Sequence, residues 1–138
     1  MTDIADHPIV YSLEDIVRDA EVDMQGGVAN FAYLALAQHV RHTFLKSLGI
    51  DINVLMPVVT EVHGKYHQVM RESHRYRLDL RFYRGRLRYH FLTEITNLTT
   101  GALAFTADQE VVFIRNGVPV RADIIVEAIA RTANIQGE

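Results

Sequence analysis

Apolar and charged residues alternate in two neighbouring parts of the chain. In residues 75–82 every second residue is apolar and every intervening residue is charged. After a break at Gly85, the alternation returns in residues 87–95. A period of two is typical of an antiparallel strand with one buried face and one solvated face. The two runs therefore predict a β-hairpin, and further strands are predicted over residues 58–66 and 102–114.

The longest helical pattern covers residues 30–48, where apolar residues recur at intervals of three and four. Asn30 is a predicted N-cap, and Gly49 is a predicted stop just past the last turn. A short terminal helix is predicted over residues 124–133, while residues 9–22 fit either a strand or a helical turn. The apolar stripe of the long helix consists of Tyr33, Ala37, Val40, Phe44 and Leu48.

One long helix followed by four successive strands predicts an α+β fold, in which the helix packs on one face of an antiparallel sheet. The chain has 138 residues, of which 49% are hydrophobic and 22% are charged, a balance typical of a globular protein. This length suffices for one hydrophobic core, so residues 1–138 are predicted to form a single domain.

Composition removes several classes of function. The chain has no cysteine, which excludes a disulfide framework, a thiolate metal site and a cysteine nucleophile. Its histidines do not form the spaced pair with an intervening acid that marks a zinc helix, so no metal is expected. We see no targeting segment and no stretch of 18 apolar residues, and we therefore expect a cytoplasmic protein without a membrane partner.

The net charge of −3 argues against nucleic acid as a partner, because phosphate neutralisation needs an excess of Lys and Arg. Seven of the fourteen basic residues nevertheless lie between Arg71 and Arg88. Most of these arginines are expected on the polar faces of the hairpin, paired with Asp79 and Glu94. The alternative for some of them is binding of an anionic small molecule.

Candidate chemistry concentrates just before the long helix. Asp23 is followed by Gly26 and Gly27 and then by the helix start near Asn30, whose first N–H groups have no intrahelical acceptor. These donors and the positive end of the helix dipole suit an oxygen that gains negative charge. A carboxylate facing such a donor site has the parts needed to hydrolyse an activated acyl group. Taken alone, however, the same residues favour an acid that only stabilises the helix start, because acidic residues are common before helices for dipole reasons.

The spacing of Asp23, Gly26, Val28 and Tyr33 resembles the 4-hydroxybenzoyl-CoA thioesterase family of hotdog proteins. The resemblance continues to about Arg121, through the helix end at 44–49, the residues 58–61, Tyr66 and the run 117–121. It implies a hotdog fold: one long central helix wrapped by an antiparallel sheet of about five strands. It also implies an active site at the interface of a homodimer or homotetramer.

The resemblance further implies hydrolysis of an acyl-CoA or acyl carrier protein thioester without a cofactor. Asp23 matches the catalytic nucleophile or general base, and the N–H of Asn30 matches the donor that polarises the thioester carbonyl. The sequence departs from the family pattern at Gly27, Ala29 and Gln38, where the family often has His, Asn and Glu. The residues expected to bind substrate are Gly26, Gly27, Val28, Phe31, Tyr33 and Tyr66, with Arg84 and Arg86 expected at the phosphates of coenzyme A.

Two other functions stay open. A hotdog dehydratase or hydratase needs a catalytic His, and the sequence places none near the helix entrance. A non-catalytic module that binds acyl-CoA fits the missing polar residues at positions 27, 29 and 38. A serine hydrolase is disfavoured because no serine lies in a Gly-x-Ser-x-Gly elbow.

Overall fold

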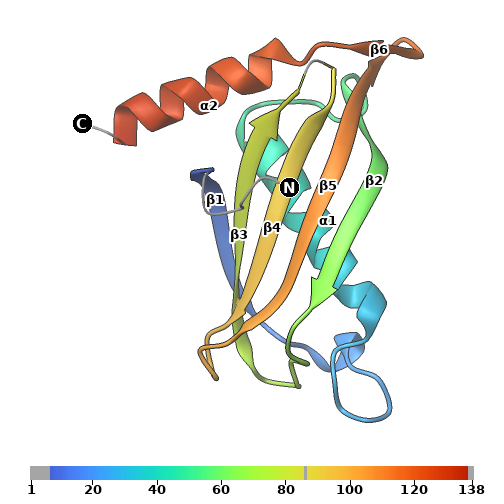
Figure 1. Cartoon of the computed structure of the whole chain (residues 1–138), viewed down its shortest axis with the longest axis vertical. Coiled ribbons are helices and arrows are strands. Elements are labelled where there is room, and N and C mark those ends of the chain that lie inside the picture. The colour runs from blue at the N-terminus through green and yellow to red at the C-terminus, as the bar shows by residue number, and fades with distance from the viewer. Residues whose placement is uncertain (1–6, 86, 137–138) are drawn as a thin grey trace.

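The computed structural model describes residues 7–85 and 87–136, with side chains up to residue 131. In this part of the chain a central helix, α1 (Asn30–Ser47), lies along one face of a six-stranded antiparallel sheet (Figure 1). The strand order is β1-β3-β4-β5-β2, and the short β6 pairs with β5. A second helix, α2 (Asp123–Gln136), follows β6 at one end of the sheet. The strands are β1 (Ile9–Ile16), β2 (Met56–Tyr66), β3 (Arg75–Arg84), β4 (Tyr89–Asn97), β5 (Leu103–Arg115) and β6 (Val118–Val120).

The α+β class and the predicted hairpin are confirmed. Strands β3 and β4 pair from Tyr76 opposite Asn97 to Arg84 opposite Tyr89. The apolar positions of both strands face α1 and form the core, as the period of two requires. Buried core side chains of the hairpin are Tyr76, Leu78, Leu80, Tyr89, Phe91 and Ile95.

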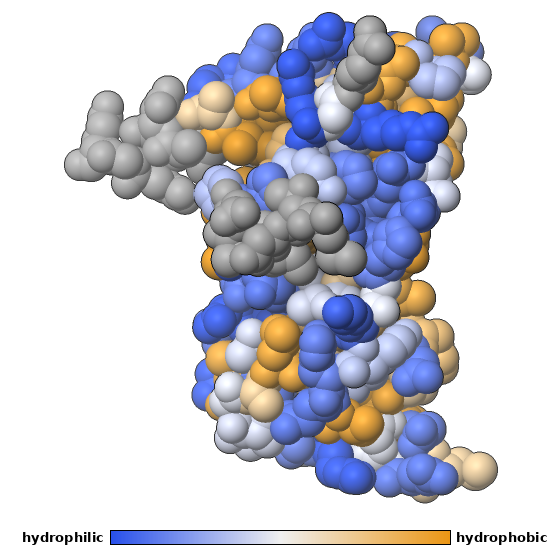
Figure 2. Space-filling view, viewed as in Figure 1, coloured by the Kyte–Doolittle hydropathy of each residue, from blue (hydrophilic) through white to orange (hydrophobic). Residues whose placement is uncertain are grey.

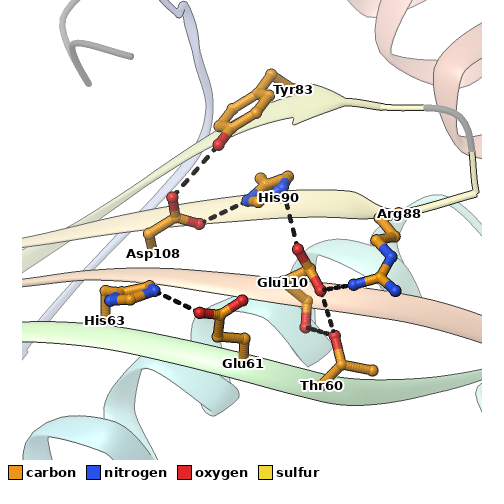
Figure 3. Close-up of polar contacts among 8 residues, drawn as sticks. All are labelled: Thr60, Glu61, His63, Tyr83, Arg88, His90, Asp108 and Glu110. Carbon is orange, nitrogen blue, oxygen red and sulfur yellow. Dashed lines mark hydrogen bonds and ion pairs between the residues drawn. The ribbon is translucent and has the colours of Figure 1, made fainter. Parts of the chain in front are cut away.

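The opposite face of the sheet carries the charged positions. Arg77 Nε lies 2.9 Å from Asp79 Oδ2, and Arg81 Nε lies 2.6 Å from Glu94 Oε1, so both predicted carboxylate partners are confirmed. Carboxylates and cationic groups alternate across the strands, which makes this face self-complementary in charge. Figure 3 shows further polar contacts of the same face, among Thr60, Glu61, His63, Tyr83, Arg88, His90, Asp108 and Glu110.

In the N-terminal segment 9–22, left open between strand and helical turn, Ile9–Ile16 form the strand β1 and Asp19–Glu21 form a short 3-10 helix. The strand β1 is held by the sheet. It pairs antiparallel with β3, with Tyr11 opposite Leu80 and Leu13 opposite Leu78. Both side chains are partly buried against the core. Contact with β3, more than sixty residues further along the chain, decides the conformation that the local pattern left ambiguous.

The bounds of α1 agree with the predicted helix except at its cap. Asn30 is the first helical residue, and the N-cap is Ala29, whose backbone is extended (φ −66°, ψ 145°) and whose side chain makes no capping hydrogen bond. The prediction of Asn30 as N-cap is therefore wrong by one residue. At the other end Gly49 has φ +78°, and Ile50 N–H donates to the Leu45 carbonyl at 3.2 Å, as in a Schellman motif.

Among the described residues, no helix is long and apolar enough to cross a bilayer.

Candidate active site

The Asp23 carboxylate belongs to a tight turn closed by antiparallel pairing of Val22 with Val28. Asp23 N–H donates to the Gly27 carbonyl at 2.8 Å, and Gly26 N–H donates to the Asp23 carbonyl at 3.0 Å. Gly26 has φ +81°, a conformation that glycine adopts without a steric penalty. The carbonyl of Gly27 thus closes the turn, and Gly26 with its positive φ reverses the direction of the chain.

Backbone N–H groups of the same turn orient the carboxylate of Asp23. Its Oδ1 accepts hydrogen bonds from Gln25 N–H at 2.9 Å and from Gly27 N–H at 3.4 Å, and the residue is exposed to solvent. Within the part of the chain that the structure describes, these are the hydrogen bonds of the Asp23 side chain. The carboxylate was predicted to face the first turn of α1. Within the described residues of one copy, no hydrogen bond joins the carboxylate to that turn.

The first turn of α1 follows this loop directly and offers open donors. Ala29 N–H donates to the Glu21 carbonyl at 3.1 Å, and Ala32 N–H donates to the Ala29 carbonyl at 2.9 Å. No acceptor for the N–H groups of Asn30 and Phe31 is found among the described residues. Donors at the first turn of a helix, with the dipole behind them, suit an oxyanion or a polarised carbonyl.

Aromatic rings support this first turn from the side of β2. The hydroxyl of Tyr66 donates to the carbonyl of Asn30 at 3.3 Å. Its ring centroid lies 5.5 Å from that of Tyr33 and 4.9 Å from that of Phe105. Tyr33 is 2% exposed and accepts a hydrogen bond from Met70 N–H at 3.0 Å, and burial raises its pKa. Tyr33 thus anchors α1 in the core, whereas Tyr66, half exposed, borders the surface.

The predicted substrate-binding residues divide between surface and interior. Phe31 is 73% exposed on the first turn of α1, where it can contact an acyl group. Gly27 and Val28 are buried where the chain closes the Asp23 turn, so these two residues shape the turn. The structure therefore brings one cluster together: the Asp23 turn, the open N–H groups of Asn30 and Phe31, and the ring of Tyr66.

Arg84 does not belong to this cluster. The Asp23 turn lies at the Arg75 end of β3, because Gly27 pairs with Arg71 and the nearby Val17 N–H donates to the His74 carbonyl at 2.8 Å. Arg84 ends the same strand, nine residues further on. At about 3.3 Å per residue this separation is about 30 Å. Arg86, the other residue expected at the phosphates, lies outside the described residues.

The segment between β2 and β3 joins the site although no sequence pattern indicated it. Val28 N–H donates to the Met70 carbonyl at 2.8 Å, and Arg71 Nη1 donates to the Gln25 carbonyl at 3.3 Å. These contacts hold the Asp23 turn from outside. The segment has neither a period of two nor a helical period, so only the folded chain reveals its role.

A model of the thioesterase-like superfamily matches residues 17–130, which is most of the chain. The chain belongs to the thioesterase-like superfamily, and the resemblance read from the sequence is confirmed at this level. None of the curated proteins matches the sequence.

Solved structures show the same fold. A 1,4-dihydroxy-2-naphthoyl-CoA thioesterase from Synechocystis is similar with a TM-score of 0.79 and 15% identity, covering 87% of this chain and 95% of that one. A DHNA-CoA thioesterase from Staphylococcus aureus has a TM-score of 0.75 and 22% identity, with 92% and 94% covered. A thioesterase complexed with coenzyme A and Zn from Thermus thermophilus has a TM-score of 0.79 and 19% identity, with 88% and 92% covered. The hotdog fold is therefore confirmed.

Proposed function

We propose that this protein hydrolyses acyl-CoA thioesters at the cluster formed by the Asp23 turn and the first turn of α1. The observation that carries the proposal is the pair of open N–H groups at Asn30 and Phe31, directly after an oriented carboxylate. A thioester carbonyl that accepts these hydrogen bonds becomes more electrophilic, and the oxyanion formed on attack is stabilised there. Membership of the thioesterase-like superfamily supports this chemistry.

Asp23 can act in this reaction in either of two ways, as a general base or as a nucleophile. As a general base it takes a proton from water, the water oxygen attacks the carbonyl carbon, and the C–S bond breaks. As a nucleophile it attacks the carbonyl carbon, the C–S bond breaks to release the thiolate, and water then hydrolyses the resulting anhydride. In both cases the products are the carboxylic acid and the thiol of the carrier, with the proton from water reaching the sulfur.

A second copy of the chain is proposed to complete the site along β2. This strand is the edge of the described sheet, eleven residues long, and its far side presents backbone groups without a neighbouring strand. Apolar side chains are exposed on it, including Val59, Val62 and Tyr66. A long, apolar edge is a template for pairing with another chain, and a two-fold axis pairs two copies antiparallel. A homotetramer, the larger of the predicted assemblies, stays a prediction.

The test of the reaction is Asp23→Asn, with thiol release measured over a panel of acyl-CoA substrates. Loss of general-base or nucleophilic catalysis predicts a fall in kcat of about a hundredfold or more. Asp51→Asn is the matched control, because Asp51 Oδ1 also accepts a backbone N–H two residues on, from Asn53 at 2.9 Å. Near-wild-type turnover by Asp23→Asn overturns the role of Asp23, and binding of acyl-CoA without thiol release by the wild type supports a non-catalytic module.

The test of the assembly is sedimentation equilibrium of the wild type and of Val62→Lys. A charge placed on the inner face of β2 is expected to disfavour burial of that edge, giving folded monomers with little activity. Val118→Lys is the control, because Val118 is 57% exposed on β6, away from the β2 edge. A wild-type protein that sediments as a monomer while fully active contradicts the interface.

A further inference from the structure

The segment between β2 and β3 connects the Asp23 turn to the turn between β4 and β5. All three lie at the same end of the sheet, at the bottom of the view in Figure 1. On one side, Gly27 pairs with Arg71, and Arg71 Nη1 donates to the Gln25 carbonyl at 3.3 Å. On the other side, the segment contacts Asn97, the last residue of β4. A change in this segment can therefore reach the turn that orients the Asp23 carboxylate.

The amide group of Asn97 determines the hydrogen-bonding role of His74. Asn97 is fully buried, and its Oδ1 accepts hydrogen bonds from the N–H groups of Thr99 at 2.9 Å and Thr100 at 3.2 Å. Backbone N–H groups only donate, so the other atom of the amide group is the donor Nδ2. This Nδ2 lies 2.9 Å from His74 Nδ1, which must therefore act as an acceptor.

A second donor leads to the same conclusion about the ring. The backbone N–H of Arg71 also donates to His74 Nδ1, at 3.2 Å. Two donors thus converge on the single lone pair of this nitrogen, and the ring is held neutral with its proton on Nε2. A proton added to Nδ1 removes both hydrogen bonds at once, because it occupies the lone pair that accepts them.

The turn that carries Arg71 and His74 depends on such contacts. His74 N–H donates to the Arg71 carbonyl at 3.1 Å, and Ser73 between them has φ +70°, a region that serine rarely adopts. A conformation of this kind persists only where its surroundings hold it. Here the Arg71 N–H is held by His74 Nδ1, and the Ser73 N–H donates to the Val17 carbonyl at 3.1 Å. Loss of the first contact removes a restraint that keeps Arg71 beside the Asp23 turn.

The charges around His74 do not oppose a proton on its ring. Figure 2 shows mainly hydrophilic residues along this lower rim of the molecule. Ionisable residues of its own segment and the start of β3 are His67, Arg71, Glu72, Arg75 and Tyr76. Those of the segment that contacts it through Val17 are Glu14, Asp15, Arg18, Asp19 and Glu21. Residues 95–102 carry none. Carboxylates outnumber guanidinium groups in this set, so the surrounding charge tolerates an imidazolium.

We propose that His74 is a positioning residue for the Asp23 turn and acts only as the neutral ring with its proton on Nε2, held by Asn97. The inference rests on the proposed function, because it concerns how the carboxylate of that site is kept in place. In mild acid the ring takes up a proton at Nδ1, both hydrogen bonds are lost, and hydrolysis slows. Histidine changes charge between about pH 5 and 8, well above the range of aspartate, so this loss is separate from titration of a catalytic carboxylate.

The first test replaces His74 by asparagine and by leucine. Asparagine can place Oδ1 where Nδ1 stood, as an acceptor that gains no proton, whereas leucine offers no acceptor. Thiol release from an acyl-CoA is measured from about pH 5 to about pH 8. We expect His74→Asn to keep the wild-type kcat at the upper end and to lose the fall that the wild type shows on acidification. In His74→Leu, kcat should be at least about tenfold lower with KM unchanged.

Two outcomes of this test overturn the proposal. One is a wild-type profile without a fall in kcat on acidification, and the other is the same fall in His74→Asn. His39→Asn is the matched control, because His39 is exposed on α1 and its replacement should leave the wild-type profile unchanged.

Asn97→Asp tests the partner of the ring. Its carboxylate still accepts from the N–H groups of Thr99 and Thr100, but the oxygen in place of Nδ2 accepts as well and favours a proton on His74 Nδ1. The fall in kcat should therefore move to higher pH, and an unchanged profile overturns the role of Asn97. Circular dichroism checks the fold of each variant, and the two His74 variants decide the proposal if Asn97→Asp does not fold.

NMR of isotope-labelled protein separates this inference from the hydrolytic proposal, since it requires no turnover. The ring nitrogens of His74 should show a neutral ring with its proton on Nε2 at about pH 8. The amide resonances of Gly26 and Gly27 should follow protonation of His74 in the wild type and stay constant in His74→Asn. This result supports the positioning role even if Asp23 proves dispensable for hydrolysis. A proton on Nδ1 of the neutral ring, or turn amides that do not respond, overturns it even if Asp23 proves essential.

Discussion

The close contact between Gly27 and Val69 yields a quantitative prediction about the turn that carries Asp23. A Cβ atom added at Gly27 would lie 2.6 Å from Val69 Cγ1 and 4.0 Å from Val69 Cβ. Carbon atoms in contact prefer about 3.5–4.0 Å, so the methyl group of alanine would overlap Val69 Cγ1 by about 1 Å. Overpacking costs about 1–3 kcal/mol in a well-packed core, and since Val69 is half exposed and can shift, we expect the lower end of that range, about 1 kcal/mol. Gly27 is not among the glycines with positive φ, so alanine meets no backbone penalty there.

Removing the obstructing atom should remove the cost. Val69 is 56% exposed, so Val69→Ala alone should change the free energy of unfolding by only about 0.5 kcal/mol. In the Val69→Ala background, the nearest side-chain atom to the new Cβ of Gly27→Ala is Cβ of residue 69, at 4.0 Å, an ordinary contact distance. The substitution should then be neutral, or stabilising by about 0.4–1 kcal/mol because it restricts the unfolded chain.

The assay is a double-mutant cycle of urea unfolding, followed by far-UV circular dichroism at one fixed protein concentration. A coupling free energy of at least about 1 kcal/mol between the two positions is expected. If Gly27→Ala is equally destabilising with valine and with alanine at position 69, the steric explanation is refuted.

Two further substitutions test other contacts of the site and the core. Tyr66→Phe removes the 3.3 Å hydrogen bond to the Asn30 carbonyl but keeps the ring. The value of kcat should therefore fall about two- to tenfold with KM unchanged. A raised KM with unchanged kcat would instead indicate that the hydroxyl contacts the substrate. Arg41 is buried, which lowers its pKa to about 10, and its Nη1 donates to Gln109 Oε1 at 2.6 Å. Arg41→Met should cost about 1–3 kcal/mol in urea unfolding by leaving that amide without its partner, and adding Gln109→Leu should recover the loss. A double variant less stable than the single one contradicts this account.

Local patterns predicted the elements whose neighbours are close in sequence. The β3–β4 hairpin follows from alternation on both sides of Gly85, because each strand buries one face and the turn is short. The helix α1 follows from its apolar stripe and from Gly49. Where the partner is distant, the pattern was insufficient: β1 acquires its strand conformation only by pairing with β3, and the cap of α1 moved from Asn30 to Ala29.

The candidate site divides in the same way. The order Asp23, Gly26, Val28 and Tyr33, together with the matched motifs as far as Arg121, indicated the family and through it the reaction class, because these motifs are local structures that keep their spacing along the chain. Sequence could not show that Arg84 and the Asp23 turn lie at opposite ends of β3, which are about 30 Å apart, because that separation is set by the length and direction of the strand. It also could not show that residues 67–71 support the turn or that β2 is an edge. Strand order and the separation of sites are properties of the tertiary structure, since they depend on contacts between residues far apart in the chain.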